Sequence, residues 1–128
     1  MHILITGAAG MVGRKITEQL LREPRIGQAS VTKLTLHDVV APRAEPTDAT
    51  SILPITGDIS DRMVIDRLVA EKPDIIMHLA AIVSGEAEAD FDKGYAINLD
   101  GTRHLFDAVR LQNYKPRMIF ASSIAVFG

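Results

Sequence analysis

The stretch LITGAAGMVGRK, from Leu4 to Lys15, decides the fold of this chain. It joins a short β-branched run, residues 2–6, to a helical pattern, residues 11–22, in which apolar positions recur every four residues. Three glycines cross the junction at a spacing of three, namely Gly7, Gly10 and Gly13. The stretch therefore predicts a strand, a glycine-rich turn and a helix in succession.

The same alternation continues along the chain. Further strands are predicted at residues 33–40, 52–56 and 74–80, and residues 117–127 are predicted as a last strand that runs into a loop. Further helices are predicted at residues 60–71 and 94–113. Apolar strands separated by helices favour right-handed crossovers and a parallel sheet. We therefore expect one α/β domain over residues 1–128, a Rossmann-type doubly wound parallel sheet with strand order 3-2-1-4-5 that stops before its sixth strand.

Some local details follow from the same patterns. Residues 23–30 and 41–51 are predicted as loops, the second because it is rich in Pro, Ala and Asp. Ser60 is the expected N-cap of the helix at residues 60–71. The helix at residues 94–113 is expected to place five side chains on one side, namely Leu99, Thr102, Leu105, Phe106 and Val109.

The composition excludes several classes of function. The net charge is −2 with acidic and basic residues interspersed, which argues against nucleic-acid binding. Without cysteine there is no disulfide or thiolate metal site, and no metal is expected from the widely spaced histidines, which are His2, His37, His78 and His104. Neither a secretory leader nor a run of membrane-spanning length is present, so we expect a cytoplasmic protein with no membrane partner.

The glycine turn has three interpretations. A turn between a strand and a helix can bring backbone N–H groups up to a phosphate, since glycine has no side chain in the way. The P-loop pattern fails, because the fifth residue after Gly7 is Val12 and Gly13 is followed by Arg14. The spacing G-x-x-G-x-x-G also departs from the standard dinucleotide fingerprint. A dinucleotide turn and a purely structural turn both stay open on the glycines alone.

Asp38 favours the dinucleotide interpretation. It ends the second predicted strand, where a carboxylate can accept hydrogen bonds from the ribose hydroxyls of adenosine. A carboxylate at this point repels a 2′-phosphate, and no arginine follows directly, so NAD is preferred to NADP. The alternative is that Asp38 only caps the end of a strand.

Five motifs in register carry a family resemblance. They are TGAAGMVG at residues 6–13, GDISD at 57–61, HLAA at 78–81, INLDGT at 97–102 and SSIAVFG at 122–128. Together they resemble the N-terminal part of the extended short-chain dehydrogenase/reductase family, the NAD-dependent epimerases and dehydratases. The resemblance covers essentially the whole chain. The sequence departs from the family at Phe127, where most members have tyrosine.

The resemblance implies roles for individual residues. The glycines and the amides of Met11 and Val12 would face the pyrophosphate, and Asp38 would take the ribose. Asp58 and Ile59 would lie along the adenine, and Asn98 would support the backbone near the nicotinamide. The other implied cofactor contacts are Leu79, Ala80, Ala81, Ala121 and Ser122.

The resemblance also implies an activity. Within the family, the sequence resembles those of sugar-acid dehydrogenases, which implies oxidation of a secondary hydroxyl in a sugar acid such as D-erythronate. The resemblance implies that Ser123 orients that hydroxyl. Ser84 and Glu86 are weaker candidates for substrate contact. A nucleotide-sugar epimerase or dehydratase is the first alternative, because the motifs mostly serve the cofactor. Relatives commonly form homodimers, which implies the same here.

The proton acceptor of this family, a tyrosine with a lysine four residues later, does not occur in the sequence. Tyr95 is followed at that distance by Leu99 and Tyr114 by Met118, so these 128 residues alone are expected to be inactive. We expect them to be the N-terminal part of a longer enzyme, with a non-catalytic dinucleotide-binding module as the second alternative. The apolar strand at residues 117–127 would leave the isolated chain with an edge that self-associates.

Overall fold

The computed structural model describes residues 1–127, apart from the side chains of Ser84 and Ala125. Its main sheet has five parallel strands in the order β5-β4-β1-β6-β7, which confirms the predicted order 3-2-1-4-5. In chain order the strands are β1 (His2–Thr6), β4 (Lys33–Asp38), β5 (Ser51–Thr56), β6 (Ile75–His78) and β7 (Arg117–Phe120). The Rossmann-type fold is thus present, with β1 at its centre.

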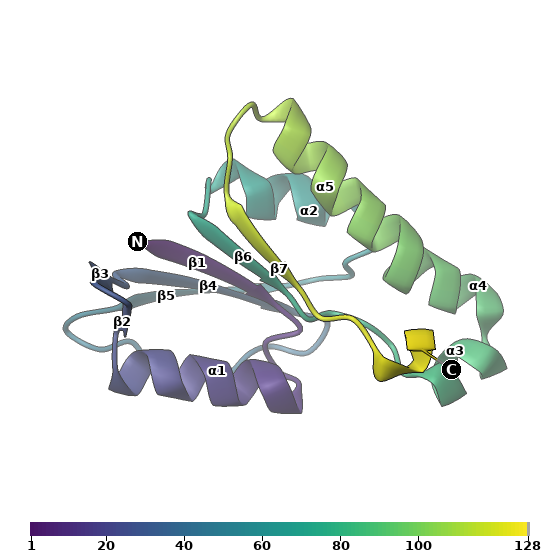
Figure 1. The fold of residues 1–128 in the computed structure, drawn as a ribbon, viewed down its shortest axis with the longest axis horizontal. Coiled ribbons are helices and arrows are strands. Elements are labelled where there is room, and N and C mark those ends of the chain that lie inside the picture. The colour runs from purple at the N-terminus through teal and green to yellow at the C-terminus, as the bar shows by residue number, and fades with distance from the viewer. Residues whose placement is uncertain (128) are drawn as a thin grey trace.

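Helices cover both faces of the sheet. Helix α1 (Met11–Arg22) lies on one face, and helices α2 (Arg62–Ala70) and α5 (Thr102–Leu111) lie on the other (Figure 1). Side chains of β1 alternate between the two layers: Ile3 and Ile5 pack in the core on the α1 side, and Leu4 packs in the core with α2 and α5. This alternation is the reason why an uninterrupted apolar strand suits the centre of the fold.

The first loop predicted from the sequence is a hairpin. Residues 23–30 contain two short antiparallel strands, β2 (Arg25–Ile26) and β3 (Ala29–Ser30), which form a separate two-stranded sheet (Figure 1). Gly27 in the connection has φ of 59°, a conformation that favours glycine. Residues 41–50 contain no helix or strand, in agreement with the second predicted loop.

The expected cap of the second helix is wrong by one position. Helix α2 has Asp61 as its N-cap, and the carboxylate accepts a hydrogen bond of 2.8 Å from the Met63 amide. Ser60 instead donates its hydroxyl and its amide to the Asp58 carboxylate. Both residues are good N-caps, and the Asp58 contact removes Ser60 from that role.

The long predicted helix is divided. Its parts are a π-helix η1 (Tyr95–Gly101) and α5, and two helices absent from the prediction, α3 (Ser84–Ala89) and α4 (Phe91–Gly94), precede them. Because a π-helix bonds i to i+5, it shifts every later side chain around the axis. Leu105 and Val109 are buried as expected, whereas Leu99 and Phe106 are 52% and 46% exposed, so the single apolar side was wrong for these two.

Candidate functional site

The glycine turn after β1 is closely packed. Gly7 has φ of 73°, and a Cβ there would lie 2.8 Å from the Ala80 nitrogen. A Cβ on Gly13 would lie 2.3 Å from the Gly7 carbonyl oxygen. Gly10 is the N-cap of α1, has no side chain to cap it, and donates its amide to the Gly7 carbonyl at 3.2 Å. The turn therefore requires glycine at positions 7 and 13 and brings the start of α1 close to the end of β6.

A cleft of about 610 Å³ opens at the carboxyl edge of the sheet beside this turn. Its walls come from the turn, from the ends of β4, β5 and β6, and from α3 to η1. The residues that line it are Gly7, Ala9, Gly10, His37, Asp38, Val39, Val40, Asp58, Ile59, Leu79, Ala80, Ala81, Ile82, Glu86, Lys93 and Ile97. In an open parallel sheet this edge, where the strand order reverses, is the usual place of a ligand.

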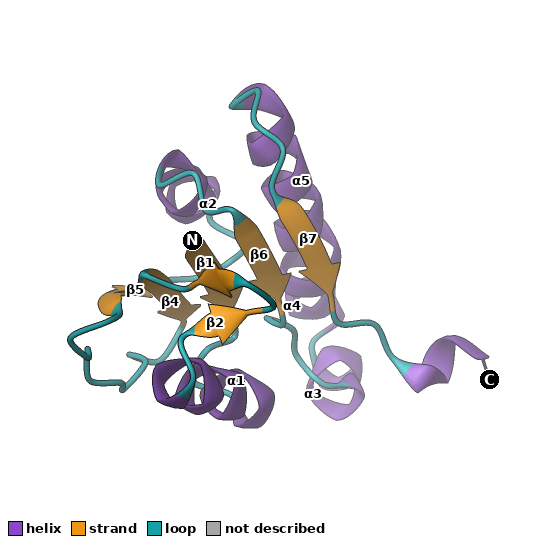
Figure 2. Cartoon of the chain, turned by 60° about the vertical axis from the view of Figure 1, so that its left-hand side comes forward, coloured by secondary structure: helices purple, strands orange, loops and turns teal. Residues whose placement is uncertain are grey.

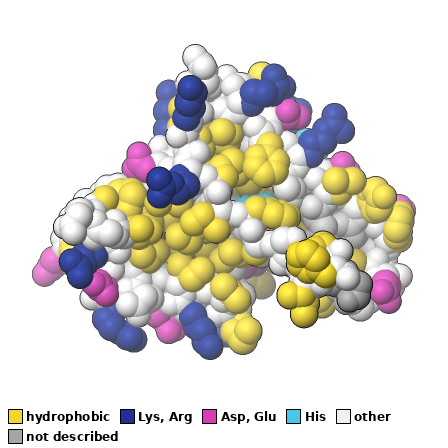
Figure 3. Space-filling model, viewed as in Figure 1, with side chains coloured by type: hydrophobic (Ala, Val, Ile, Leu, Met, Phe, Trp, Pro, Cys, Tyr) yellow, Lys and Arg dark blue, Asp and Glu magenta, His cyan; other side chains and the backbone are white. Residues whose placement is uncertain are grey.

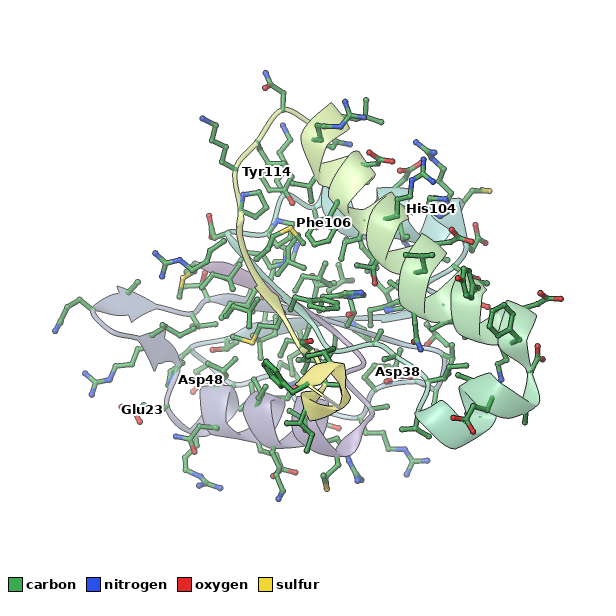
Figure 4. All side chains as sticks on the ribbon, turned by 45° about the vertical axis from the view of Figure 1, so that its right-hand side comes forward. Glu23, Asp38, Asp48, His104, Phe106 and Tyr114 are labelled. Atoms are coloured by element: carbon green, nitrogen blue, oxygen red, sulfur yellow. The ribbon has the colours of Figure 1, made fainter. Side chains whose placement is uncertain are left out.

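Asp38 joins the end of β4 to the glycine turn. Its Oδ2 accepts a hydrogen bond of 2.9 Å from the Ala9 amide, and its Oδ1 accepts one of 3.4 Å from the Val40 amide. The carboxylate is thus fixed at the cleft wall, next to the start of α1 (Figure 4). A carboxylate held in this way can accept hydroxyl donors from a ligand in the cleft.

Asp58 and Ile59 form another part of the wall. Asp58 Oδ1 accepts the amide and the hydroxyl of Ser60, each at 2.8 Å, which fixes the orientation of its carboxylate. Ile59 is 2% exposed and belongs to the core. A Cβ on Gly101 would lie 3.0 Å from the Ile59 carbonyl oxygen, so this glycine allows the π-helix to approach the wall closely.

The segment that follows β6 is held on both sides. The Thr6 hydroxyl oxygen accepts the amides of Leu79 and Ala80 at 3.2 and 3.3 Å. Farther on, Asn98 Oδ1 accepts the Ile82 amide at 3.0 Å and its Nδ2 donates to the Ile82 carbonyl at 3.1 Å. Asn98 itself lies outside the lining of the cleft, so its side chain acts on the wall and not on the space inside it.

His37 lines the cleft and His78 lies beneath it, and both side chains are almost completely buried. Burial lowers the pKa of both, that of His78 to about 4. The Gly57 carbonyl lies 3.0 Å from His37 Nε2, which must therefore carry the proton. Within the described residues His37 Nδ1 is buried without a hydrogen-bond partner, and as an unprotonated nitrogen it is only an acceptor. Both imidazoles are accordingly neutral near pH 7.

The structure does not bring every predicted residue to the cleft. The side chains of Met11 and Val12 are 66% and 52% exposed, and Gly13 packs beneath the turn. Ala121, Ser122 and Ser123 follow β7, and the next segment, the 3-10 helix η2 (Ile124–Phe127), projects from the sheet (Figure 2). These three lie outside the lining.

The two weaker candidates for substrate contact lie in α3. Glu86 lines the cleft and forms an ion pair of 2.5 Å with Lys93, which also lines it. The Ser84 side chain is outside the described residues. Sequence reasoning missed Lys93, because α3 and α4 were not predicted. Val39, Val40 and Ile82 were also missed, although each follows a strand end at the same edge, and that position was a usable signal.

Among residues 1–127, no cluster of three or more His, Cys, Asp or Glu side chains has a geometry that could hold a metal ion. No helix in the same range combines the length and the apolar character needed to span a membrane.

Comparison with known proteins gives one family match and several relatives. The model of the NAD-dependent epimerase/dehydratase family matches residues 3–128. A curated relative, D-erythronate dehydrogenase from Cupriavidus necator, is 42% identical over the whole chain, which spans 40% of that relative's length. The chain therefore covers less than half of the protein it is compared with.

Solved structures show the same coverage. The nucleoside-diphosphate-sugar epimerase from Agrobacterium tumefaciens has 55% identity and a TM-score of 0.95, and the match covers 100% of this chain and 39% of that one. A mutant of uronate dehydrogenase from the same organism, complexed with NAD, has 30% identity and a TM-score of 0.73 over 95% of this chain and 40% of that one.

Proposed function

This chain belongs to the NAD-dependent epimerase/dehydratase family, and we propose that it is the NAD-binding part of an oxidoreductase that acts on a secondary hydroxyl of a sugar acid. The observation that carries the proposal is the cleft at the carboxyl edge, where the glycine turn and the Asp38 carboxylate lie together. The relative named D-erythronate dehydrogenase supports the sugar acid as substrate class.

The lining of the cleft supports the assignment of different residues to different parts of NAD. The glycine turn and the amides of Met11 and Val12 at the start of α1 would hold the pyrophosphate, because a helix N-terminus favours anions. Asp38 would accept the adenosine ribose hydroxyls, and Asp58 with Ile59 would hold the adenine. The small side chains of Ala80 and Ala81 leave room for the rest of the cofactor.

The remaining predicted residues belong to the nicotinamide end. Bound NAD would supply the hydride acceptor. Asn98 would hold the wall through Ile82, Ala121 and Ser122 would contact the cofactor, and Ser123 would orient the substrate hydroxyl. Glu86, and Ser84 with it, would contact the substrate. Residues 1–128 contain no Tyr-x-x-x-Lys, so none of them is assigned the role of the base that takes the hydroxyl proton.

A second function is favoured by one observation. The solved structure with 55% identity is named a nucleoside-diphosphate-sugar epimerase. In such a reaction NAD would be reduced and reoxidised within one turnover. Both functions use the same cofactor cleft, so the described residues serve either one. The two differ in whether NADH accumulates.

The decisive experiment uses the full-length gene product. D-Erythronate and NAD are supplied, and NADH is followed by absorbance; accumulation of NADH is the expected result. Conversion of a nucleotide sugar without net NADH would establish the epimerase instead. Binding of NAD with neither reaction would favour a non-catalytic module, and no binding of NAD would overturn the proposal.

Cellular setting and assembly are part of the same proposal. We place the protein in the cytoplasm, in carbohydrate metabolism, because the chain lacks cysteine and its relative acts on a sugar acid. We also propose a homodimer. Exposed apolar side chains on η1 and α5, such as Leu99 and Phe106, supply a surface that a second copy would bury.

A further inference from the structure

A continuous chain of hydrogen bonds lies beneath the cleft. His78 Nδ1 lies 2.8 Å from the Thr6 hydroxyl, and His78 Nε2 lies 2.9 Å from the Thr102 hydroxyl. Thr102 in turn donates to the Asn98 carbonyl at 2.8 Å. One buried imidazole thus connects β1, β6 and the helix that carries Asn98.

The direction of these bonds can be worked out from Thr6. Its hydroxyl oxygen accepts the Ala80 amide and shares the Leu79 amide, which also donates to the Thr6 carbonyl at 3.2 Å. An oxygen that accepts from these amides favours giving its own proton to His78 Nδ1, which leaves the ring proton on Nε2.

The hydrogen bond of His78 Nε2 assigns the same tautomer. Thr102 spends its only proton on the Asn98 carbonyl, so its oxygen must accept from His78 Nε2. Every donor in the chain then meets an acceptor with no alternative arrangement. A charged imidazole would carry a proton on Nδ1 as well. Two donors, His78 Nδ1–H and the Thr6 O–H, would then face each other.

The chain begins and ends on the same wall of the cleft. It starts at the amides of Leu79 and Ala80, and it ends at Asn98, whose side chain holds both backbone polar groups of Ile82. The Leu79–Ala80 peptide also packs against Gly7, where a Cβ has no space. Movement of this wall would therefore change the width of the cleft beside the glycine turn.

We propose that His78, in its neutral Nε2–H form, is a positioning residue that fixes the Leu79–Ile82 wall of the cleft through Thr6 and Thr102 and so preorganises the site for its dinucleotide. This inference rests on the proposed NAD site. His78 does not line the cleft and touches no ligand there; it acts through residues that do. The stacked Phe120 ring, 5.8 Å away between centroids, holds the imidazole plane from β7.

Matched threonine variants test the proposal in the full-length gene product. Thr6→Val and Thr102→Val each remove one hydroxyl at constant volume, and each is expected to raise the Kd for NAD about tenfold by calorimetry. Thr102→Ser keeps the hydroxyl and should restore the Kd. Thr35→Val is the control: Thr35 is 0% exposed and its hydroxyl lies 2.8 Å from His2 Nε2, outside the cleft.

Denaturation midpoints separate positioning from stability. The control Thr35→Val should lower the midpoint as Thr6→Val does and leave the Kd unchanged. If Thr6→Val and Thr102→Val fold and bind NAD as the unaltered protein does, or if the control weakens binding equally, the proposal is wrong.

A second measurement needs neither NAD nor a variant. Long-range ¹H–¹⁵N spectra of the unaltered protein should show His78 protonated only on Nε2 at pH 7, with slow amide exchange at Leu79, Ala80 and Ile82. Protonation on Nδ1 would overturn the inference. Absence of NAD binding combined with the expected spectra would contradict the proposed function and leave the positioning of the wall intact.

Discussion

Asp38 is the residue on which cofactor choice depends. Its carboxylate is fixed by the Ala9 amide and faces the cleft, while Asp48 lies in the 41–50 loop away from it (Figure 4). A negative charge at this point favours ribose hydroxyls and disfavours a 2′-phosphate.

Asp38→Asn is therefore expected to weaken NAD binding tenfold or more and to reduce the preference for NAD over NADP. Calorimetry with both cofactors measures the change. Asp48→Asn removes the same charge outside the cleft and should leave both affinities unchanged. Equal binding of NAD and NADP by the unaltered protein would contradict the assigned role of Asp38.

His78 predicts the pH dependence of stability. Its pKa is about 4 in the folded chain, because burial disfavours the charged ring, against an ordinary value of 6.5. Below pH 6.5 the unfolded chain binds a proton that the folded chain refuses, so the free energy of unfolding falls as the pH is lowered from 6.5 to 4, by about 3 kcal/mol. The neighbouring His37 lowers the pKa of His78 further. Burial also lowers the pKa of His37, so His37 contributes to the loss of stability at low pH in the same direction.

Urea denaturation at several pH values measures this loss. His78→Phe keeps an aromatic ring and removes the titrating group, so its stability should be lower at pH 7 and should fall less between pH 6.5 and 4. Equal slopes for the two proteins would show that His78 is not the group responsible.

Sequence reasoning reached some of these residues and missed others for a clear reason. Asp38 and the glycines were found because their places follow from strand ends and turn geometry, which are local. The Asp61 cap was missed because Ser60 is equally suitable until Asp58 binds it. The His78 contacts join residues separated by 72 and 24 positions, and no spacing in the sequence indicates them.

Among the elements, the glycine turn and α1 depend most strictly on residue size. Gly13→Ala would place a methyl group 2.3 Å from the Gly7 carbonyl oxygen, so the turn must open. We expect a loss of several kcal/mol in stability, together with loss of NAD binding.

Gly85→Ala provides the matched control for this substitution. Gly85 is also in a helix, and apart from its chain neighbours and its own helix backbone no atom lies within 4 Å of the position of its Cβ. Alanine there should be neutral or stabilising by up to about 1 kcal/mol, because glycine is the poorer helix former. Thermal unfolding of the two variants separates steric overlap from helix propensity; similar losses for both would refute the packing argument.

Elements were predictable where one periodicity persisted. Four of the main strands and α1 were predicted within two residues of their observed bounds, since burial on one or both faces leaves a clear apolar pattern. The last strand begins where it was predicted and ends at Phe120, because the apolar residues 124–127 form a 3-10 helix. The hairpin at 25–30 consists of strands of two residues, too short for a pattern. The π-helix disrupts the helical period, so the boundary between η1 and α5 had no signal.

At the scale of the whole molecule, the open side of the sheet is decisive. Within residues 1–127, β7 is the last strand on its side, and Ile119 and Phe120 are 44% and 53% exposed. Apolar side chains gather across the centre of the face seen in Figure 3. An apolar strand with free backbone groups is a template for another chain.

Expressed alone, residues 1–128 are therefore expected to self-associate, and light scattering would detect this. Ile119→Lys should reduce association by placing a charge on the edge strand. Met63→Lys, at an 80% exposed position on α2, is the control that changes the charge without changing the edge. A monodisperse monomer of the unaltered fragment would disprove the prediction.

The strand order also determines when each strand can pair with its neighbours during synthesis. Strand β1 is made first, yet its two neighbours are β4 and β6, which follow at residues 33–38 and 75–78. Strand β1 therefore lacks its second partner until β6 has been made, and parallel pairing across such separations is slow. During synthesis Ile3, Leu4 and Ile5 would be open to chaperones, or to aggregation, until β6 has left the ribosome.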